Sequence, residues 1–210
     1  QGINLSYFPV MYFVGVGFAG VILQLFFYGI TASWLLAAVT LIFVQMQLYA
    51  ENLYTDELSG LYNRRYLNAV LAKRKTAGWK SLHGIMMDVN DFKHINDSMG
   101  HSIGDKAVST MGSILFRSIP DTGMAIRYAG DEFIVLLADV DTECVLATMD
   151  EINDNISQFN SSGAEPFSLS VSMGYAEFGS EDDAEVFLMH MDEKMYEEKR
   201  KYHLLKNSDN

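Results

Sequence analysis

Three acidic side chains stand where short apolar segments end, and carboxylates placed this way can support metal-dependent chemistry. Asp88 closes the apolar run 82–89, while Asp131 and Glu132 lie between the runs 124–128 and 133–137. If these runs are neighbouring strands, the three carboxylates converge at one edge of a sheet. Mg²⁺ takes one or two carboxylates and completes its shell with water and substrate phosphates. The pattern therefore indicates Mg²⁺, with Mn²⁺ as a second candidate, acting on a phosphate-bearing substrate.

The residues that follow Asp88 could bind the rest of such a substrate. Asp91, Phe92 and Lys93 offer turn amides and an ammonium group for phosphate oxygens. Polar side chains that could hydrogen-bond a nucleobase come next, namely Asn96, Asp97, His101 and Asp105.

Two other metal sites are excluded by the same residues. A calcium loop of EF-hand type starting at Asp88 would need a ligand and a glycine where Phe92 and Lys93 stand. His101 has no second His or Cys at ligand spacing, so it does not indicate a transition-metal site.

The elements that must position these residues follow from hydrophobic patterning. Strands are expected at 82–89, 124–128, 133–137 and 168–175, and helices are expected after an N-cap at Asn63, over 104–119 and from Ser180 and Asp183 onward. Ala129-Gly130-Asp131-Glu132 separates two of the strands as a hairpin. The expected fold is therefore α/β (α+β), a mixed sheet flanked by helices, rather than a doubly wound parallel sheet.

Charge is distributed very unevenly along the chain. All 27 acidic and 15 basic residues lie in 51–210, and residues 1–50 contain none. The net charge of −12 argues against binding to nucleic acid, which needs a basic face. The single cysteine, Cys144, excludes an intramolecular disulfide and suits a reducing compartment.

The charge-free segment 1–50 is interpreted as a membrane segment. It is too long for one span and for a signal peptide, so two transmembrane helices are expected, about 7–27 and 33–49, followed by a linker at 51–62 and a catalytic domain at 63–210. The nearby bases lie beyond the second span, which the positive-inside rule assigns to the cytoplasm. The expectation is a multi-pass protein of the cytoplasmic (inner) membrane with a cytoplasmic catalytic domain.

The region 56–203 resembles the GGDEF domain of diguanylate cyclases. Five runs carry the resemblance in the family's order: 56–65 (DELSGLYNRR), 88–97 (DVNDFKHIND) with Gly100-His101 and Gly104-Asp105, 127–133 (RYAGDEF), 172–174 (SMG) and 195–199 (MYEEK).

The resemblance implies a palm-like sheet, one GTP half-site on each protomer, and a homodimer that condenses two GTP into cyclic di-GMP and pyrophosphate. It implies that Asp88 and Asp131 hold Mg²⁺ with the Val89 carbonyl, and that Glu132 is a further essential carboxylate. The substrate-binding residues that it implies are Asp91, Phe92, Lys93 and Lys199 for phosphate and Asn96 and Asp105 for guanine, with His101 beside them.

The sequence departs from the family pattern at several positions. Ala129 replaces the first glycine of the signature, Asn90 stands where many relatives have Asp, and His203 stands in place of a phosphate-binding Arg. The product-inhibition motif is absent, since its positions hold Pro120 and Gly123. These departures leave open an alternative, a GGDEF-like regulatory module that binds nucleotide without catalysis. A purely scaffolding domain would not require this carboxylate pattern.

Overall fold

The computed structural model describes residues 32–74, 77–179 and 183–208, together with residues 15, 18, 19, 22 and 26. Contacts divide the chain into two units, Gln1–Tyr54 and Thr55–Asn210. The first unit contains helix α2 (Ala32–Asn52), which coincides with the predicted second span. No helix among the described residues has the length and apolarity needed to cross a membrane, so that span is not confirmed. Most of the predicted first span, 7–27, lies outside the described residues.

The second unit is built on a five-stranded mixed sheet. Its strands are β1 (Tyr62–Asn63), β2 (Leu82–Val89), β3 (Met124–Ala129), β4 (Glu132–Ala138) and β5 (Val171–Glu177). Their order across the sheet is β1-β3-β4-β2-β5, with β1 parallel to β3 and every other neighbouring pair antiparallel. The predicted mixed sheet is therefore confirmed.

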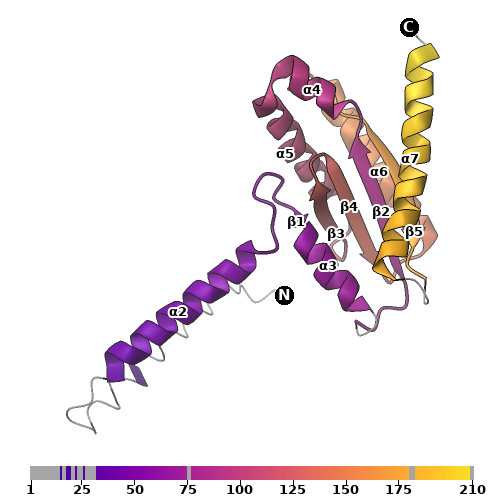
Figure 1. The fold of residues 1–210 in the computed structure, drawn as a ribbon. Coiled ribbons are helices and arrows are strands. Elements are labelled where there is room, and N and C mark those ends of the chain that lie inside the picture. The colour runs from indigo at the N-terminus through magenta and orange to yellow at the C-terminus, as the bar shows by residue number, and fades with distance from the viewer. Residues whose placement is uncertain are drawn as a thin grey trace. The chain divides into compact units, whose positions relative to one another are not determined.

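Helices cover both faces of this sheet (Figure 1). They are α3 (Arg64–Ala72), α4 (Phe92–Met99), α5 (His101–Ser118), α6 (Thr142–Ser162) and α7 (Ala184–Ser208). Helices α5 and α6 pack on one face with Ile85, Met87 and Val89 of β2, whereas α3 and α7 pack on the other with Leu82 and Met86. Alternate residues of β2 thus enter two different cores, which explains why the whole strand is buried.

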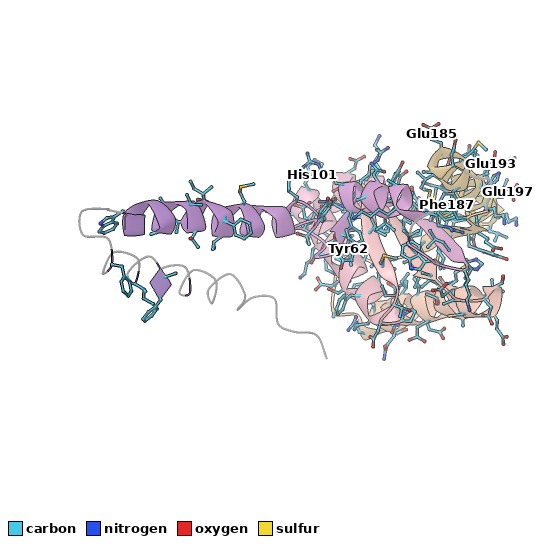
Figure 2. The ribbon with its side chains drawn as sticks, turned by 90° about the horizontal axis from the view of Figure 1, so that it is seen from below. Tyr62, His101, Glu185, Phe187, Glu193 and Glu197 are labelled. Atoms are coloured by element: carbon cyan, nitrogen blue, oxygen red, sulfur yellow. The ribbon has the colours of Figure 1, made fainter. Side chains whose placement is uncertain are left out.

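Helix α7 presents one apolar and one charged side. Phe187 is fully buried against the sheet, while Glu185, Glu193 and Glu197 lie on the outer side (Figure 2). A side chain at Gly174 of β5 would collide with the α7 backbone at Met195, so α7 approaches the sheet closely there. This close approach fixes the position of the residues that follow Met195.

Several local predictions hold and others do not. The Asn63 carboxamide caps α3 by accepting from the amides of Arg65 (2.9 Å) and Tyr66 (3.2 Å), as predicted. Helix α5 begins earlier than predicted, at His101, and α4, α6 and β1 were not predicted. The strand predicted at 168–175 starts only at Val171, because the Asn160 side chain occupies both the N–H and the carbonyl of Leu169.

The segment 55–62, which the sequence analysis assigns to a linker, packs within the second unit. Leu61 is buried in the core beside α5, and Leu58 packs against the same cluster. The Asp56 carboxylate accepts from the backbone (2.9 Å) and the hydroxyl (2.7 Å) of Ser59. This segment is therefore an ordered turn of the domain.

Candidate functional site

The three predicted carboxylates meet at one end of the central strand pair. Asp88 and Glu132 are direct register partners of the antiparallel β2–β4 pair. Asp131 lies in the hairpin turn before β4, and its carbonyl accepts a hydrogen bond from the Val89 N–H at 3.2 Å. The convergence inferred from the sequence is thus present in the fold.

Burial and, after it, neighbouring like charges raise the pKa of two members of this group. Burial and then the Asp88 charge raise the pKa of Asp131 above its ordinary value. Burial, Asp88 and Asp131 act in the same direction on the pKa of Glu132. Both side chains are therefore partly withdrawn from water next to other carboxylates, and a bound divalent cation would favour their ionised forms.

The carboxylate oxygens gathered here are ligands of the kind that Mg²⁺ binds. Within the described ranges, no three Asp, Glu, His or Cys side chains gather closely enough to hold a metal together. A pair of carboxylates leaves most of the coordination shell to water and phosphate oxygens, which is the usual arrangement for Mg²⁺. The assignment of Mg²⁺ to Asp88, Asp131 and the Val89 carbonyl, which the family resemblance implies, stays a prediction.

Lys199 of α7 forms an ion pair with one of these carboxylates. Its Nζ lies 2.6 Å from Oδ1 of Asp88, whose side chain is only 9% exposed. The preceding residue, Glu198, accepts a hydrogen bond from the Met173 N–H at 2.9 Å, which fixes this part of α7 on β5. Lys199 therefore reaches the site from a helix far away in the sequence, as the prediction requires.

Asn90 is a structural residue and not part of the carboxylate group. It is 5% exposed, its Oδ1 accepts from the Ser172 hydroxyl at 2.8 Å, and its N–H donates to the Ser170 carbonyl at 2.9 Å. An amide oxygen satisfies this hydroxyl without adding a fourth charge to the cluster. The replacement of Asp by Asn here is therefore compatible with the metal pair.

The segment Asn90–Lys93 consists of the turn after β2 and the first two residues of α4. It is called the phosphate loop below, after the ligand predicted for it. Asp91 has a left-handed backbone (φ 56°) and starts α4 without capping it through its side chain. Its carboxylate Oδ2 accepts instead from the Tyr202 hydroxyl at 2.8 Å and from Lys206 Nζ at 2.6 Å. The hydrogen bond from Lys206 lowers the pKa of Asp91, and Tyr202 adds to this against the effect of burial.

These contacts change how the predicted phosphate residues can act. Because the carboxylate of Asp91 is engaged and negative, only its backbone can serve a phosphate. Lys93 is exposed, and no ion pair among the described residues involves it, so its ammonium group can reach a ligand. Phe92 is half-buried and packs on the core, where it anchors the first turn of α4.

Sequence reasoning missed Tyr202 and Lys206. Together with Lys199 they recur at intervals of three and four residues, which places all three on one face of α7. This spacing is the feature of the sequence from which Tyr202 and Lys206 could have been predicted to lie beside Lys199.

The predicted base-binding residues lie where α4 meets α5. The Nδ1 of His101 lies 3.3 Å from Oδ1 of Asn96. The Asn96 side chain also packs so tightly on Gly104 that a Cβ there would overlap its carboxamide. Asp105, the next residue, is exposed on α5. Asn96 and His101 are therefore in contact, and Asn96 also packs against the residue before Asp105.

Arg127 ties the hairpin turn to the start of the domain. Its Nε donates to the Gly130 carbonyl at 2.9 Å, and its Nη1 lies 3.1 and 3.2 Å from the two oxygens of Asp56. The positive φ of the turn falls on Gly130 (40°) and not on Ala129, which ends β3. The methyl group at Ala129 therefore introduces no backbone strain.

The fold and the site together define a mixed α/β domain with three converging carboxylates, one of which is paired with a lysine of the last helix. A family model described as the diguanylate cyclase GGDEF domain matches residues 53–203. The chain belongs to this family.

Several curated proteins and solved structures are similar to the chain. The response regulator PleD of Caulobacter vibrioides is 33% identical over 152 residues, covering 69% of this chain and 34% of that protein. The diguanylate cyclase DosC of Escherichia coli is 29% identical over 151 residues, 70% of this chain and 33% of that protein. The chain thus spans about a third of the length of these relatives.

Solved structures share the fold. The coiled coil and GGDEF domain of DgcB from Caulobacter crescentus, in complex with c-di-GMP, has a TM-score of 0.70 at 24% identity, covering 78% of this chain and 90% of that one. The GGDEF domain of PA1120 from Pseudomonas aeruginosa has a TM-score of 0.59 at 28% identity, covering 70% and 89%.

Proposed function

We propose that the domain is a diguanylate cyclase that joins two GTP molecules into cyclic di-GMP and releases two pyrophosphates. The observation that carries this proposal is the group formed by Asp88, Asp131 and Glu132 at one end of the β2–β4 pair, with Lys199 2.6 Å from Asp88. Membership of the diguanylate cyclase GGDEF-domain family supports the same reaction.

Each residue of the group has a defined task in this reaction. The 3′-hydroxyl of one GTP attacks the α-phosphate of the other, so one P–O bond forms while the bond to pyrophosphate breaks. Asp88 and Asp131 hold Mg²⁺, which neutralises phosphate charge when bound. Glu132, whose pKa is raised by burial and neighbouring carboxylates, is suited to accept the hydroxyl proton. Lys93 and Lys199 hold phosphate oxygens.

Guanine is selected by Asn96 and Asp105 in this proposal. The guanine edge presents the N1–H and N2–H₂ donors, and a carboxylate offers two acceptor oxygens for them. His101 orients Asn96 through its ring nitrogen. Because adenine lacks this donor pair, the same residues disfavour ATP.

The reaction requires two nucleotides facing one another, and each domain supplies one half-site. We therefore propose that two copies of the chain associate as a homodimer for catalysis. The carboxylate group of each copy then serves the nucleotide bound to that copy.

A nucleotide-binding regulatory module without catalysis is the second candidate. The observation that favours it is His203, which is exposed beside Tyr202 at a ring-centroid distance of 5.5 Å. A histidine there lacks the permanent charge and the forked donors with which an arginine holds phosphate.

Segment 1–50 is proposed to attach the domain to the cytoplasmic membrane and to transmit a signal to it. The support is its complete lack of Asp, Glu, Lys and Arg. Fractionation of cells followed by alkaline extraction tests this point, since a protein held only by peripheral contacts is released into the extract.

The catalytic proposal is tested by incubating the chain with GTP and Mg²⁺ and identifying the products by chromatography and mass. We expect cyclic di-GMP and pyrophosphate in a ratio of 1:2, and no dinucleotide from ATP alone. GTP that binds but remains unconverted across a range of protein concentrations would favour the regulatory module.

A further inference from the structure

Two side chains near the end of α7 converge on a single oxygen of Asp91. Tyr202 donates to Oδ2 through its hydroxyl at 2.8 Å, and Lys206 donates through Nζ at 2.6 Å. Lys199, on the same face of the helix, holds Asp88 at 2.6 Å. One helix face therefore contacts both the end of the metal-binding strand and the loop that follows it.

Asp91 adopts a conformation that needs such support. Its φ of 56° lies in the left-handed region, which costs a non-glycine residue free energy that other contacts must offset. Its side chain makes no capping bond to α4. The residue directly precedes Phe92 and Lys93, so its backbone sets the direction of the first α4 amides and of Lys93.

We propose that Tyr202 and Lys206 are positioning residues for phosphate binding, which act through the Asp91 carboxylate to hold the phosphate loop in its ligand-ready conformation. The identity of the ligand as a guanine nucleotide rests on the proposed function. Neither side chain needs to touch the nucleotide. The order of the loop in the free protein is what these residues supply.

The proposal concerns loop order and not global stability. The side chains of Lys206 and Asp91 are 49% and 28% exposed, and ion pairs this exposed contribute little to the free energy of unfolding. Contacts that hold Asp91 can still raise ligand affinity. Without them, part of the binding free energy is spent on ordering the phosphate loop when the ligand binds. Affinity for phosphate is therefore the quantity to measure.

Tyr202 and Lys206 are together called the clamp. The test compares two clamp variants, Lys206→Met and Tyr202→Phe, with two matched controls on α7. Lys201→Met removes the same charge from an exposed position, and Tyr196→Phe removes the same hydroxyl from a side chain that is 60% exposed. The full chain is used in detergent, with 3′-deoxy-GTP as ligand because it lacks the attacking hydroxyl. Guanosine, which has no phosphate, is measured in parallel by competition.

We expect each clamp variant to lose about tenfold in affinity for 3′-deoxy-GTP, which is the scale of one charge-assisted hydrogen bond. The affinity of the clamp variants for guanosine should stay within about twofold of the wild type, because the base-binding residues are not altered. The affinity of both controls for either ligand should also stay within about twofold. Equal losses for guanosine, or for the controls, would overturn the proposal.

An Asp91→Asn background separates positioning from direct contact. If Lys206 acts through Asp91, Lys206→Met has little further effect once the carboxylate is gone. If Lys206→Met costs the same factor in both backgrounds, Lys206 contacts the phosphates itself and the proposal is wrong.

Hydrogen exchange gives a readout that does not depend on the proposed function. Without nucleotide, the amides of residues 91–95 should exchange faster in both clamp variants than in the wild type. In both controls their exchange rates should equal those of the wild type. Unchanged exchange in the clamp variants would overturn the proposal. Failure of the wild-type chain to bind 3′-deoxy-GTP would instead contradict the proposed function, and exchange would still decide whether the clamp orders the loop.

Discussion

Lys199 Nζ lies 2.6 Å from Oδ1 of Asp88, so in the free protein a lysine occupies the carboxylate proposed to hold the metal. The two residues are 111 positions apart in the sequence. Their contact links the last helix to the central strand and puts a cation in direct competition with Mg²⁺ for the same oxygen.

Removing this lysine should therefore change the affinities for metal and for nucleotide in opposite directions. We expect Lys199→Met to bind Mn²⁺ alone more tightly, by about threefold or more, because an opposing charge at contact distance is gone. Affinity for GTP with Mg²⁺ should fall by about tenfold, since a phosphate contact is lost. Titration calorimetry of the metal and the nucleotide measures both effects. Lys201→Met is the control, and weaker Mn²⁺ binding in Lys199→Met would contradict the competition.

The Asp56–Arg127 pair should make stability depend on acid. Burial alone would raise the pKa of Asp56, but hydrogen bonds from Ser59 and Arg127 outweigh it, and the pKa lies below its ordinary value of 3.8. The contribution is thus present above that value and is lost as the pH falls through the folded pKa. Asp56→Asn should cost about 1 kcal/mol at pH 7 and close to nothing at the lowest pH at which both proteins remain folded.

Urea unfolding of the wild type and of Asp56→Asn across this pH range measures the difference. Asp150→Asn, an exposed acid on α6, serves as the control. A difference between the wild type and Asp56→Asn that stays constant down to the acid limit would show that the pair does not stabilise the fold through its charge.

Gly104 should govern base recognition because of its contact with Asn96. A methyl group at this position overlaps the Asn96 carboxamide, so Gly104→Ala must displace that side chain. We expect the KM for GTP to rise by about tenfold, the scale of one lost hydrogen bond to the base, with a smaller change in kcat. Ser102→Ala, an exposed site on the same helix, should have no such effect. An unchanged KM in Gly104→Ala would argue that Asn96 does not read the base.

In the hairpin turn, we expect Gly130→Ala to lower thermal stability and Ala129→Gly to have little effect on turnover. Ala129 ends a strand, whereas Gly130 has a φ of 40°. Gly130→Ala should lower the thermal midpoint by about 2–4 °C, since left-handed backbone costs alanine about 1 kcal/mol. Ala129→Gly should change turnover by less than about threefold, because it relieves no strain. A large gain of turnover in Ala129→Gly would show that the methyl group obstructs the nucleotide instead.

Local patterns predicted much of this architecture because their causes are local. The Asn63 cap, the buried strand 82–89 and the hairpin at Gly130 each follow from a few consecutive residues. Helix α4 escaped prediction because it is eight residues long and buries only Ile95. Helix α6 was also not predicted, although its capping residue Asp141 and a regular spacing of buried residues are present in the sequence. Its buried face includes the polar Thr148, which interrupts the apolar pattern.

The site divides in the same way. The meeting of Asp88 with Asp131 and Glu132 was predictable from strand ends and a turn. The contacts of Asp91 with Tyr202 and Lys206 were not, since they depend on how α7 packs across the sheet. Asp91 consequently was assigned to phosphate binding by its position, whereas its side chain binds α7.

The most direct measurement compares turnover and nucleotide binding in wild type, Asp131→Asn and Glu132→Gln in the same detergent preparation. With GTP and Mg²⁺, the wild type should form cyclic di-GMP and both variants should lose at least about a hundredfold in rate, since each removes a group that acts on the reacting atoms. Glu132→Gln should still bind 3′-deoxy-GTP. Wild-type rates in either variant, or binding without any turnover in the wild type, would contradict the assignment of these carboxylates to catalysis.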